Sequence, residues 1–154
     1  MSKPFPLQTL LDLAQNKNDE ATRRLGELNK QLHDMQVQLE ALQQYRKEYQ
    51  MRMQSASQSG VDPTLLRNFQ DFIYKLDTAI AQQAKVVEQS RVLLQTGRDE
   101  YANARRKLKS FDTLQQRHID TQQKIESKLE QRATDEHTSR SVAYKMLNTE
   151  EQHK

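Results

Sequence analysis

The amino-acid sequence predicts an all-α protein: an elongated antiparallel coiled-coil hairpin of two helices, of which the second is longer. Three observations predict this fold: two long segments with an unbroken heptad pattern, one strong turn signal between them, and a composition poor in apolar and turn-forming residues. The 154 residues are 34% hydrophobic and include only 3 Gly and 3 Pro. Ordinary soluble domains contain about 45–50% apolar residues. We therefore expect residues 1–154 to form a single coiled-coil domain without a compact core.

The first helix is predicted over about residues 7–55. Apolar residues recur there in strictly alternating steps of four and three residues, which is the signature of a coiled coil. The seam positions are Leu7, Leu11, Ala14, Asn18, Ala21, Leu25, Leu28, Leu32, Met35, Leu39, Leu42, Arg46, Tyr49 and Met53. The polar Asn18 is expected to help fix the register or the choice of partner at some cost in stability.

The turn is predicted at about residues 56–62. The segment from Ser55 to Pro63 is rich in small polar residues and contains Gly60. Asp62 can accept hydrogen bonds from the free amides of the next helix, and Pro63 suits the first helical position. Because a short connection makes consecutive helices antiparallel neighbours, the chain is expected to fold back on itself here.

The second helix is predicted over about residues 63–132. Its seam positions are Leu66, Phe69, Ile73, Leu76, Ile80, Gln83, Val87, Ser90, Leu94, Gly97, Tyr101, Ala104, Leu108, Phe111, Gln115, His118, Gln122, Ile125 and Leu129. Beyond Arg132 the pattern gives way to polar and charged residues, so we expect residues 133–154 to form a frayed or weakly ordered tail. Pro4 and Pro6 exclude a helix before about residue 6.

Two registers satisfy the seam. One pairs Leu42 with Ile80 and Leu11 with Phe111, and the other is shifted from it by one heptad. The paired part is expected to end near Gln115, beyond which the second helix extends alone. At 1.5 Å per residue the helices would span about 75 Å and at least about 100 Å. Such a hairpin is a rod with no central core for a pocket.

No catalytic, cofactor-binding or metal-binding residues are predicted. The 4 His are scattered without a pair four residues apart, and there is no Cys. Gly-rich phosphate loops and nucleophile motifs are absent. No apolar stretch is long enough to span a membrane, so we expect a cytoplasmic protein without direct membrane insertion. A net charge of only +3 argues against nucleic acid as a partner.

A basic cluster is the sharpest charge feature. It consists of Arg105, Arg106, Lys107 and Lys109, within a segment, residues 91–117, that holds 7 basic and 3 acidic residues. A solvated helix face is the simplest interpretation. Docking against an acidic protein surface is the functional interpretation that we prefer, and nucleic-acid binding is a third.

A second stripe lies beside the seam. Gln38, Tyr45, Phe72 and Ala79 occupy heptad g positions, where coiled coils normally place Glu or Lys. The two g rows of an antiparallel pair lie on the same side, so Tyr45 and Phe72 are expected near each other. Exposed aromatic residues are typical of interface cores, and this stripe is a candidate docking site. The alternative is that these rings only widen the seam.

Several short segments keep a specific order and spacing around Gly60. They are Pro6–Leu10, Asp12–Ala14, Asp19–Ala21, Leu25–Leu28, Gln43–Tyr49 and Asn68–Ile73, followed by Leu76, Ala79 and Ile80. Over about residues 5–130 the sequence thereby resembles the FliJ family of flagellar export proteins.

The resemblance implies a non-enzymatic, soluble component of the flagellar type III export apparatus, peripherally associated with the inner membrane. Members of the family resemble the central stalk of rotary ATPases. The implied partners are the hexameric export ATPase, the cytosolic domain of the export gate membrane protein, and export chaperones. The family's gate-binding strip falls on Gln38, Leu42, Tyr45, Tyr49, Phe72, Leu76, Ala79 and Gln83. We expect the ATPase ring to bind at Arg105, Arg106, Lys107 and Lys109.

Two alternatives stay open at this point. One is the equivalent coiled-coil stalk of a virulence type III secretion system. The other is a general self-associating coiled-coil scaffold, which would form stable homodimers, whereas the hairpin is expected to be a monomer in isolation.

Overall fold

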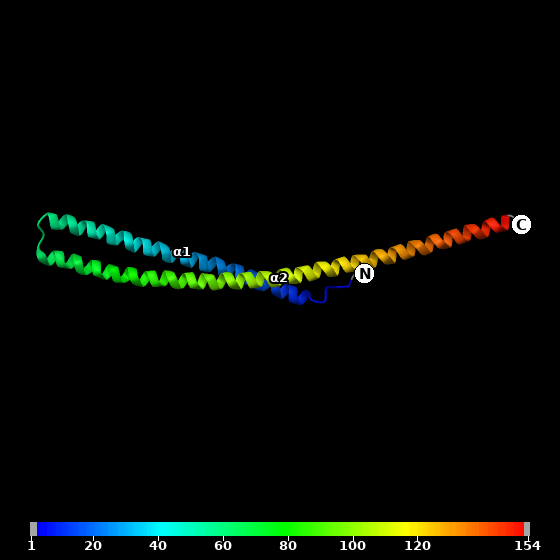
Figure 1. Cartoon of the computed structure of the whole chain (residues 1–154), viewed down its shortest axis with the longest axis horizontal. Helices are drawn as coiled ribbons and strands as arrows, with labels where there is room; N and C mark the ends of the chain where they lie inside the picture. Colours follow the sequence, from blue (N-terminus) through cyan, green and yellow to red (C-terminus); the bar gives the residue numbers. More distant parts are fainter. Residues whose placement is uncertain (1–2, 153–154) are drawn as a thin grey trace. The chain divides into compact units, whose positions relative to one another are not determined.

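The computed structural model describes residues 3–152, and two helices make up nearly all of them (Figure 1). Helix α1 spans Gln8–Gln58 and helix α2 spans Pro63–Gln152, with no strand among the described residues. The two helices pack against each other through the residues described below. The predicted all-α helical hairpin is therefore confirmed.

The contacts within the chain form two compact units. One comprises residues 16–105, and the other joins the residues up to 15 with those from 106 onward. The boundary between the units falls within both helices, and the expectation of a single coiled-coil domain stays a prediction.

The unit of residues 16–105 contains the turn. Helix α1 ends at Gln58, slightly later than expected, and α2 begins at the predicted Pro63. Gly60 has a φ of 77°, a left-handed conformation that glycine adopts without strain. The side chain of Asp62 accepts a hydrogen bond of 3.3 Å from the amide of Thr64, as expected of a residue preceding a helix.

Burial within this unit follows the heptad seam. Leu76, Val87 and Leu94 are buried, and the described residues between seam positions are mostly exposed. The alternating steps of four and three residues place all seam side chains on one stripe of each helix. Removing that stripe from water is the main source of packing free energy in a two-helix coil.

The close approach of the helices at Gly97 determines the register. A Cβ added to Gly97 would lie 2.5 Å from Cδ1 of Leu28 and 3.9 Å from Cδ1 of Leu25. This places Gly97 opposite Leu25 and Leu28, in agreement with the register that pairs Leu42 with Ile80. The register shifted by one heptad would place Asn18 opposite Gly97 instead.

In the other unit, a short N-terminal segment before α1 packs on α2. The ring centroids of Phe5 and His118 are 5.7 Å apart, and Nε2 of His118 lies 2.9 Å from the carbonyl oxygen of Lys3. The side-chain amide of Gln115 donates a hydrogen bond of 3.2 Å to Oε1 of Gln8. These contacts cover the seam face of α2 beyond the first residues of α1.

The last part of α2 corrects the expectation for residues 133–154. The chain is helical through Gln152, and residues 153 and 154 lie outside the described part. Every described residue from 123 onward is exposed, including Ile125 and Leu129, which the sequence analysis assigned to the seam. No Gly or Pro follows Gly97 in the sequence, and Lys, Glu, Gln, Arg and Ala are good helix formers. Local propensity therefore continues the helix where the seam has no partner.

Candidate docking surface

An aromatic cluster lies near the turn of the unit formed by residues 16–105. It consists of Tyr45, Tyr49, Phe69 and Phe72. Tyr49 is at its centre, with ring centroids 4.5 Å from Phe72, 5.1 Å from Phe69 and 6.3 Å from Tyr45. Tyr45 and Phe72 meet edge to face at 6.1 Å. Such tilted and edge-to-face pairs are the favoured geometry of aromatic side chains.

The cluster arises from the heptad pattern. Tyr49 and Phe69 occupy seam positions, whereas Tyr45 and Phe72 occupy the g positions beside the seam. Because the g rows of antiparallel helices face the same side, the rings meet across the two helices. The sequence analysis predicts the proximity of Tyr45 and Phe72, and the structure brings them together. The prediction from the sequence leaves Phe69 out of the strip. The signal that identifies Phe69 is its seam position opposite Tyr49.

The eight residues that the sequence analysis assigns to gate binding, here called the docking strip, continue from the cluster along both helices. Leu76 is buried, Leu42 and Ala79 are half-buried, and Gln38 is exposed. At the end away from the turn, the amide of Gln83 donates hydrogen bonds of 3.0 Å to the carbonyl oxygen of Met35 and 3.4 Å to Oε1 of Gln38. The strip is therefore a single surface in one unit.

Exposure decides what the strip offers to a partner. Tyr45 is 44% exposed, whereas Phe72 and Tyr49 are half-buried by their contacts with each other. A half-buried ring holds the two helices together, and an exposed ring is free to be covered by another molecule. Tyr45 is the side chain of the aromatic cluster with the most surface to offer.

A polar contact lies on the opposite side of the seam. Arg46 forms an ion pair with Asp77 of α2, and its Nη1 donates a hydrogen bond of 2.9 Å to Oε1 of Gln50. The hydrogen bond to Asp77, and then its charge, raise the pKa of the Arg46 guanidinium above the ordinary value. A seam position occupied by Arg is thereby tolerated, because the side chain reaches out of the seam to an exposed carboxylate.

The basic cluster of α2 is exposed along its length. Arg105 donates a hydrogen bond of 3.3 Å from Nη1 to the hydroxyl of Tyr101, one turn earlier. Arg105 ends the unit of residues 16–105, and Arg106, Lys107 and Lys109 belong to the other unit. These cations lie on a continuous stretch of helix, on several of its faces.

Neither a cluster of metal ligands nor a helix able to span a membrane is found among the described residues. No group of three His, Asp or Glu among these residues could hold a metal ion. No helix between residues 3 and 152 is both long and apolar enough to span a membrane.

Comparison with known proteins identifies the family. The profile of the family described as "Flagellar FliJ protein" matches residues 2–147. The chain belongs to the FliJ family. Two curated relatives, both called "Flagellar FliJ protein", come from Escherichia coli (strain K12) and Salmonella typhi. Each is 28% identical over 145 residues, which cover 94% of this chain and 99% of the relative. No solved structure matches.

Membership of the FliJ family makes this chain a flagellar export component. The resemblance found from the sequence segments is thereby confirmed, and its flagellar assignment is preferred over a virulence secretion system. The docking strip and the basic cluster stay predictions as binding sites.

Proposed function

We propose that this FliJ-family chain acts without catalysis of its own as a stalk in the ring of the hexameric export ATPase. In this role it couples the ring to the cytosolic domain of the export gate and handles export chaperones. It works in the cytoplasm, peripherally associated with the export apparatus of the inner membrane. The observation that carries the proposal is the partly exposed aromatic cluster beside the seam, in a family of flagellar export components.

The gate is proposed to bind the docking strip at the aromatic cluster. Tyr45 is 44% exposed and already held in place by Tyr49 and Phe72, so little side-chain entropy is lost when a partner covers it. Aromatic side chains of this kind dominate the energetics of many interfaces. About 80 Å² of newly covered ring would contribute about 2 kcal/mol, or roughly a 30-fold change in affinity.

The ATPase ring is proposed to bind the basic cluster. Arg105, Arg106, Lys107 and Lys109 present exposed cations over little more than one turn of α2, which suits an acidic surface. Each rim contact of this kind affects the association rate and its salt dependence more than it affects the final affinity.

The test compares variants of the full-length protein in binding to the gate's cytosolic domain and in stimulation of the export ATPase. Tyr45→Ala should weaken gate binding by at least tenfold and impair motility, with little change in the unfolding midpoint. Tyr74→Ala is the matched control, because this tyrosine of α2 is 73% exposed and lies off the docking strip. Phe72→Ala is less informative, since its ring also packs against Tyr49 and its loss should lower stability.

The ring assignment has its own test. Reversing the four charges of the basic cluster to Glu should reduce ATPase stimulation while gate binding persists. Unchanged stimulation in this variant would contradict the ring assignment. Equal gate binding by wild type, Tyr45→Ala and Tyr74→Ala would contradict the gate assignment.

A self-associating scaffold is the second candidate. The observation that favours it is the exposed α2 segment from residue 123 onward, which carries Tyr144, Met146 and Leu147 at 62–67% exposure. Sedimentation of the purified chain separates the two functions. A monomer at micromolar concentration favours the stalk, and a stable dimer favours the scaffold.

A further inference from the structure

Helix α2 carries an apolar stripe that is longer than the docking strip. Its g positions in five consecutive heptads hold only apolar residues, namely Leu65, Phe72, Ala79, Val86 and Leu93. Leu65 is 47%, Val86 36% and Leu93 46% exposed. Phe72 and Ala79 are half-buried. Phe72 and Ala79 belong to the docking strip, but the whole stripe covers about 42 Å of helix at 1.5 Å per residue.

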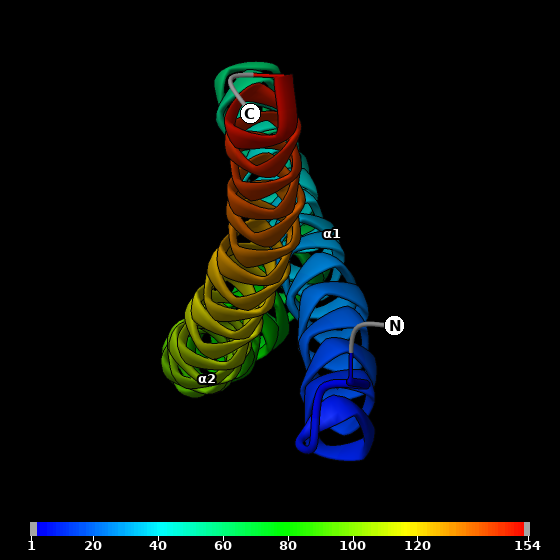
Figure 2. The same ribbon diagram turned by 90° about the vertical axis from the view of Figure 1, so that its right-hand side faces the viewer.

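The row on the other side of the α2 seam is mostly polar or charged, unlike the apolar stripe. The corresponding e positions are Gln70, Asp77, Ala84, Arg91 and Arg98, all exposed. Asp77 in this row forms the ion pair with Arg46. A two-stranded coil normally carries charged residues in both flanking rows. An apolar row on one side only is typical of a helix that packs against two neighbours. Among the described residues only α1 and α2 are helices (Figure 2).

The rows next to the apolar stripe have a charge preference. They are the g row of α1, with Arg24, Gln31, Gln38, Tyr45 and Arg52, and the c row of α2, with Asn68, Lys75, Gln82, Gln89 and Thr96. Neither row contains Asp or Glu. Arg24 lies 3.6 Å from Glu100, while Arg52 and Lys75 are exposed cations. A partner with acidic residues beside its apolar face would complement this surface.

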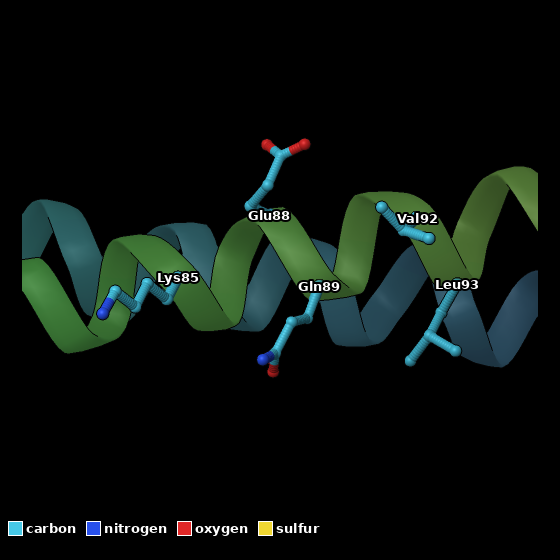
Figure 3. Close-up of a pocket in the computed structure, with 5 residues that line it drawn as sticks. All are labelled: Lys85, Glu88, Gln89, Val92 and Leu93. Atoms are coloured by element: carbon cyan, nitrogen blue, oxygen red, sulfur yellow. The ribbon is translucent and has the colours of Figure 1, made fainter.

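The region around Leu93 shows how the stripe is bordered. Figure 3 shows Leu93 and Gln89 pointing to one side of α2 and Glu88 pointing to the other. The depression of about 600 Å³ along Lys85, Glu88, Gln89, Val92 and Leu93 is lined by α2 alone. It is open helix surface, which suits an extended partner better than a small ligand.

We infer that the apolar stripe binds an amphipathic helix of about 28 residues with acidic residues flanking its apolar face. This helix lies along α2 from Leu65 to Leu93 and completes a three-helix packing with α1. The inference extends the proposed function. It rests on that function in one respect, namely that the export gate supplies the helix. Gate binding at the docking strip would then also bury Val86 and Leu93.

The first experiment uses a labelled synthetic helix as the probe. The peptide has four heptads with Leu at a and d and Glu at e and g, and a control peptide has Lys in place of Glu. By fluorescence anisotropy, the full-length protein should bind the Glu peptide at least tenfold more tightly than the Lys peptide. Val86→Ser and Leu93→Ser should each weaken this binding about tenfold.

The matched control is Tyr74→Ser, at a residue of α2 that is 73% exposed and lies outside both the stripe and the depression beside Leu93. It should bind the Glu peptide as wild type does, and circular dichroism should give all three variants the same helix content. Absence of binding to the Glu peptide, or equal loss in all three variants, would overturn the inference.

The second experiment separates the inference from the proposed function. The gate's cytosolic domain should displace the Glu peptide and should bind Val86→Ser and Leu93→Ser more weakly than wild type. Gate binding that depends on Tyr45 but not on Val86 or Leu93 would overturn the inference and leave the proposed function intact. Wild-type dimers that dissociate in Leu93→Ser would make a second copy of the chain the occupant and also overturn it.

Discussion

Two seam residues depart from apolar packing for different reasons. Gly97 costs about 1 kcal/mol in helix propensity relative to Ala, but it leaves room for Leu28 of the facing helix. Asn18 carries a buried Oδ1 atom with no hydrogen-bond partner among the described residues. The first departure is explained by close packing, and the second fits a residue that specifies the register at some cost in stability.

Replacing each of two helical glycines by Ala should have unequal effects. Gly26→Ala should raise the free energy of unfolding by about 0.5–1 kcal/mol, because nothing lies within 4 Å of the added Cβ. Gly97→Ala should give no gain or a net loss, because its Cβ would displace Leu28. Urea unfolding of both variants measures the difference. In a Leu28→Ala background, Gly97→Ala should regain its helix-propensity benefit, and failure to do so would contradict the steric explanation.

Asn18→Leu should raise the unfolding free energy by about 1–2 kcal/mol, since it removes an unpaired buried oxygen and adds apolar surface to the seam. Thermal unfolding followed by circular dichroism measures this change. Asn29→Leu, at an exposed position of α1, is the control and should change stability little. A destabilised Asn18→Leu variant would mean that the amide makes stabilising contacts in solution.

Among the elements, the N-terminal segment and the far part of α2 contrast. The segment around Phe5 is not helical because of Pro4 and Pro6, yet it is anchored by Phe5 and Lys3 on His118. The part of α2 beyond residue 122 is helical and has every described residue exposed. Secondary structure and packing are therefore separate properties in this unit: one segment packs without being a helix, and the other is a helix without packing.

Phe5→Ala should release the N-terminal segment from α2. Ring currents from Phe5 act on His118 at a centroid distance of 5.7 Å, so the imidazole proton resonances of His118 should shift in this variant. Nuclear magnetic resonance measures the effect, and His137 is the internal control because it lies on the exposed part of α2. Unchanged His118 resonances would show that the segment does not rest on α2 in solution.

For the molecule as a whole, seam packing within residues 16–105 and the turn at Gly60 bring α1 and α2 together in one chain. Two ion pairs between the helices, Arg46 with Asp77 and Arg24 with Glu100, involve partly or largely exposed side chains. Exposed pairs of this kind contribute about 0–1 kcal/mol each. Apolar burial in the seam, rather than charge, is therefore expected to hold the hairpin closed.

Cysteines introduced at Leu42 and Ile80 should form a crosslink within one molecule, because the register pairs these positions across the seam. A bifunctional thiol reagent followed by denaturing electrophoresis detects the product as a fast-migrating monomer. The control pairs Leu42 with a cysteine at Ile73, one heptad away on α2, and should crosslink poorly. Crosslinks that form only between molecules would contradict the intramolecular hairpin.

The sequence by itself determined the two helices, the turn, the seam and the position of Tyr45 and Phe72 beside it. The helices and the seam depend on an apolar period that every heptad repeats, and the turn depends on local turn chemistry. Neither requires knowledge of the facing helix. The apolar stripe from Leu65 to Leu93 is encoded in the same period. The seam ends near Arg132 and predicts the end of the helix there, but helix propensity alone continues α2 to Gln152.

Only the tertiary structure decided the register of the seam and the contacts of the segment before α1. Two registers satisfy the same heptads, and the room that Gly97 leaves for Leu28 distinguishes them. The contact of Phe5 with His118 has no periodic signal, because it joins an extended segment to a distant helix. The physical reason is that a heptad specifies which side of a helix is buried, whereas steric fit between particular side chains specifies what is buried against it.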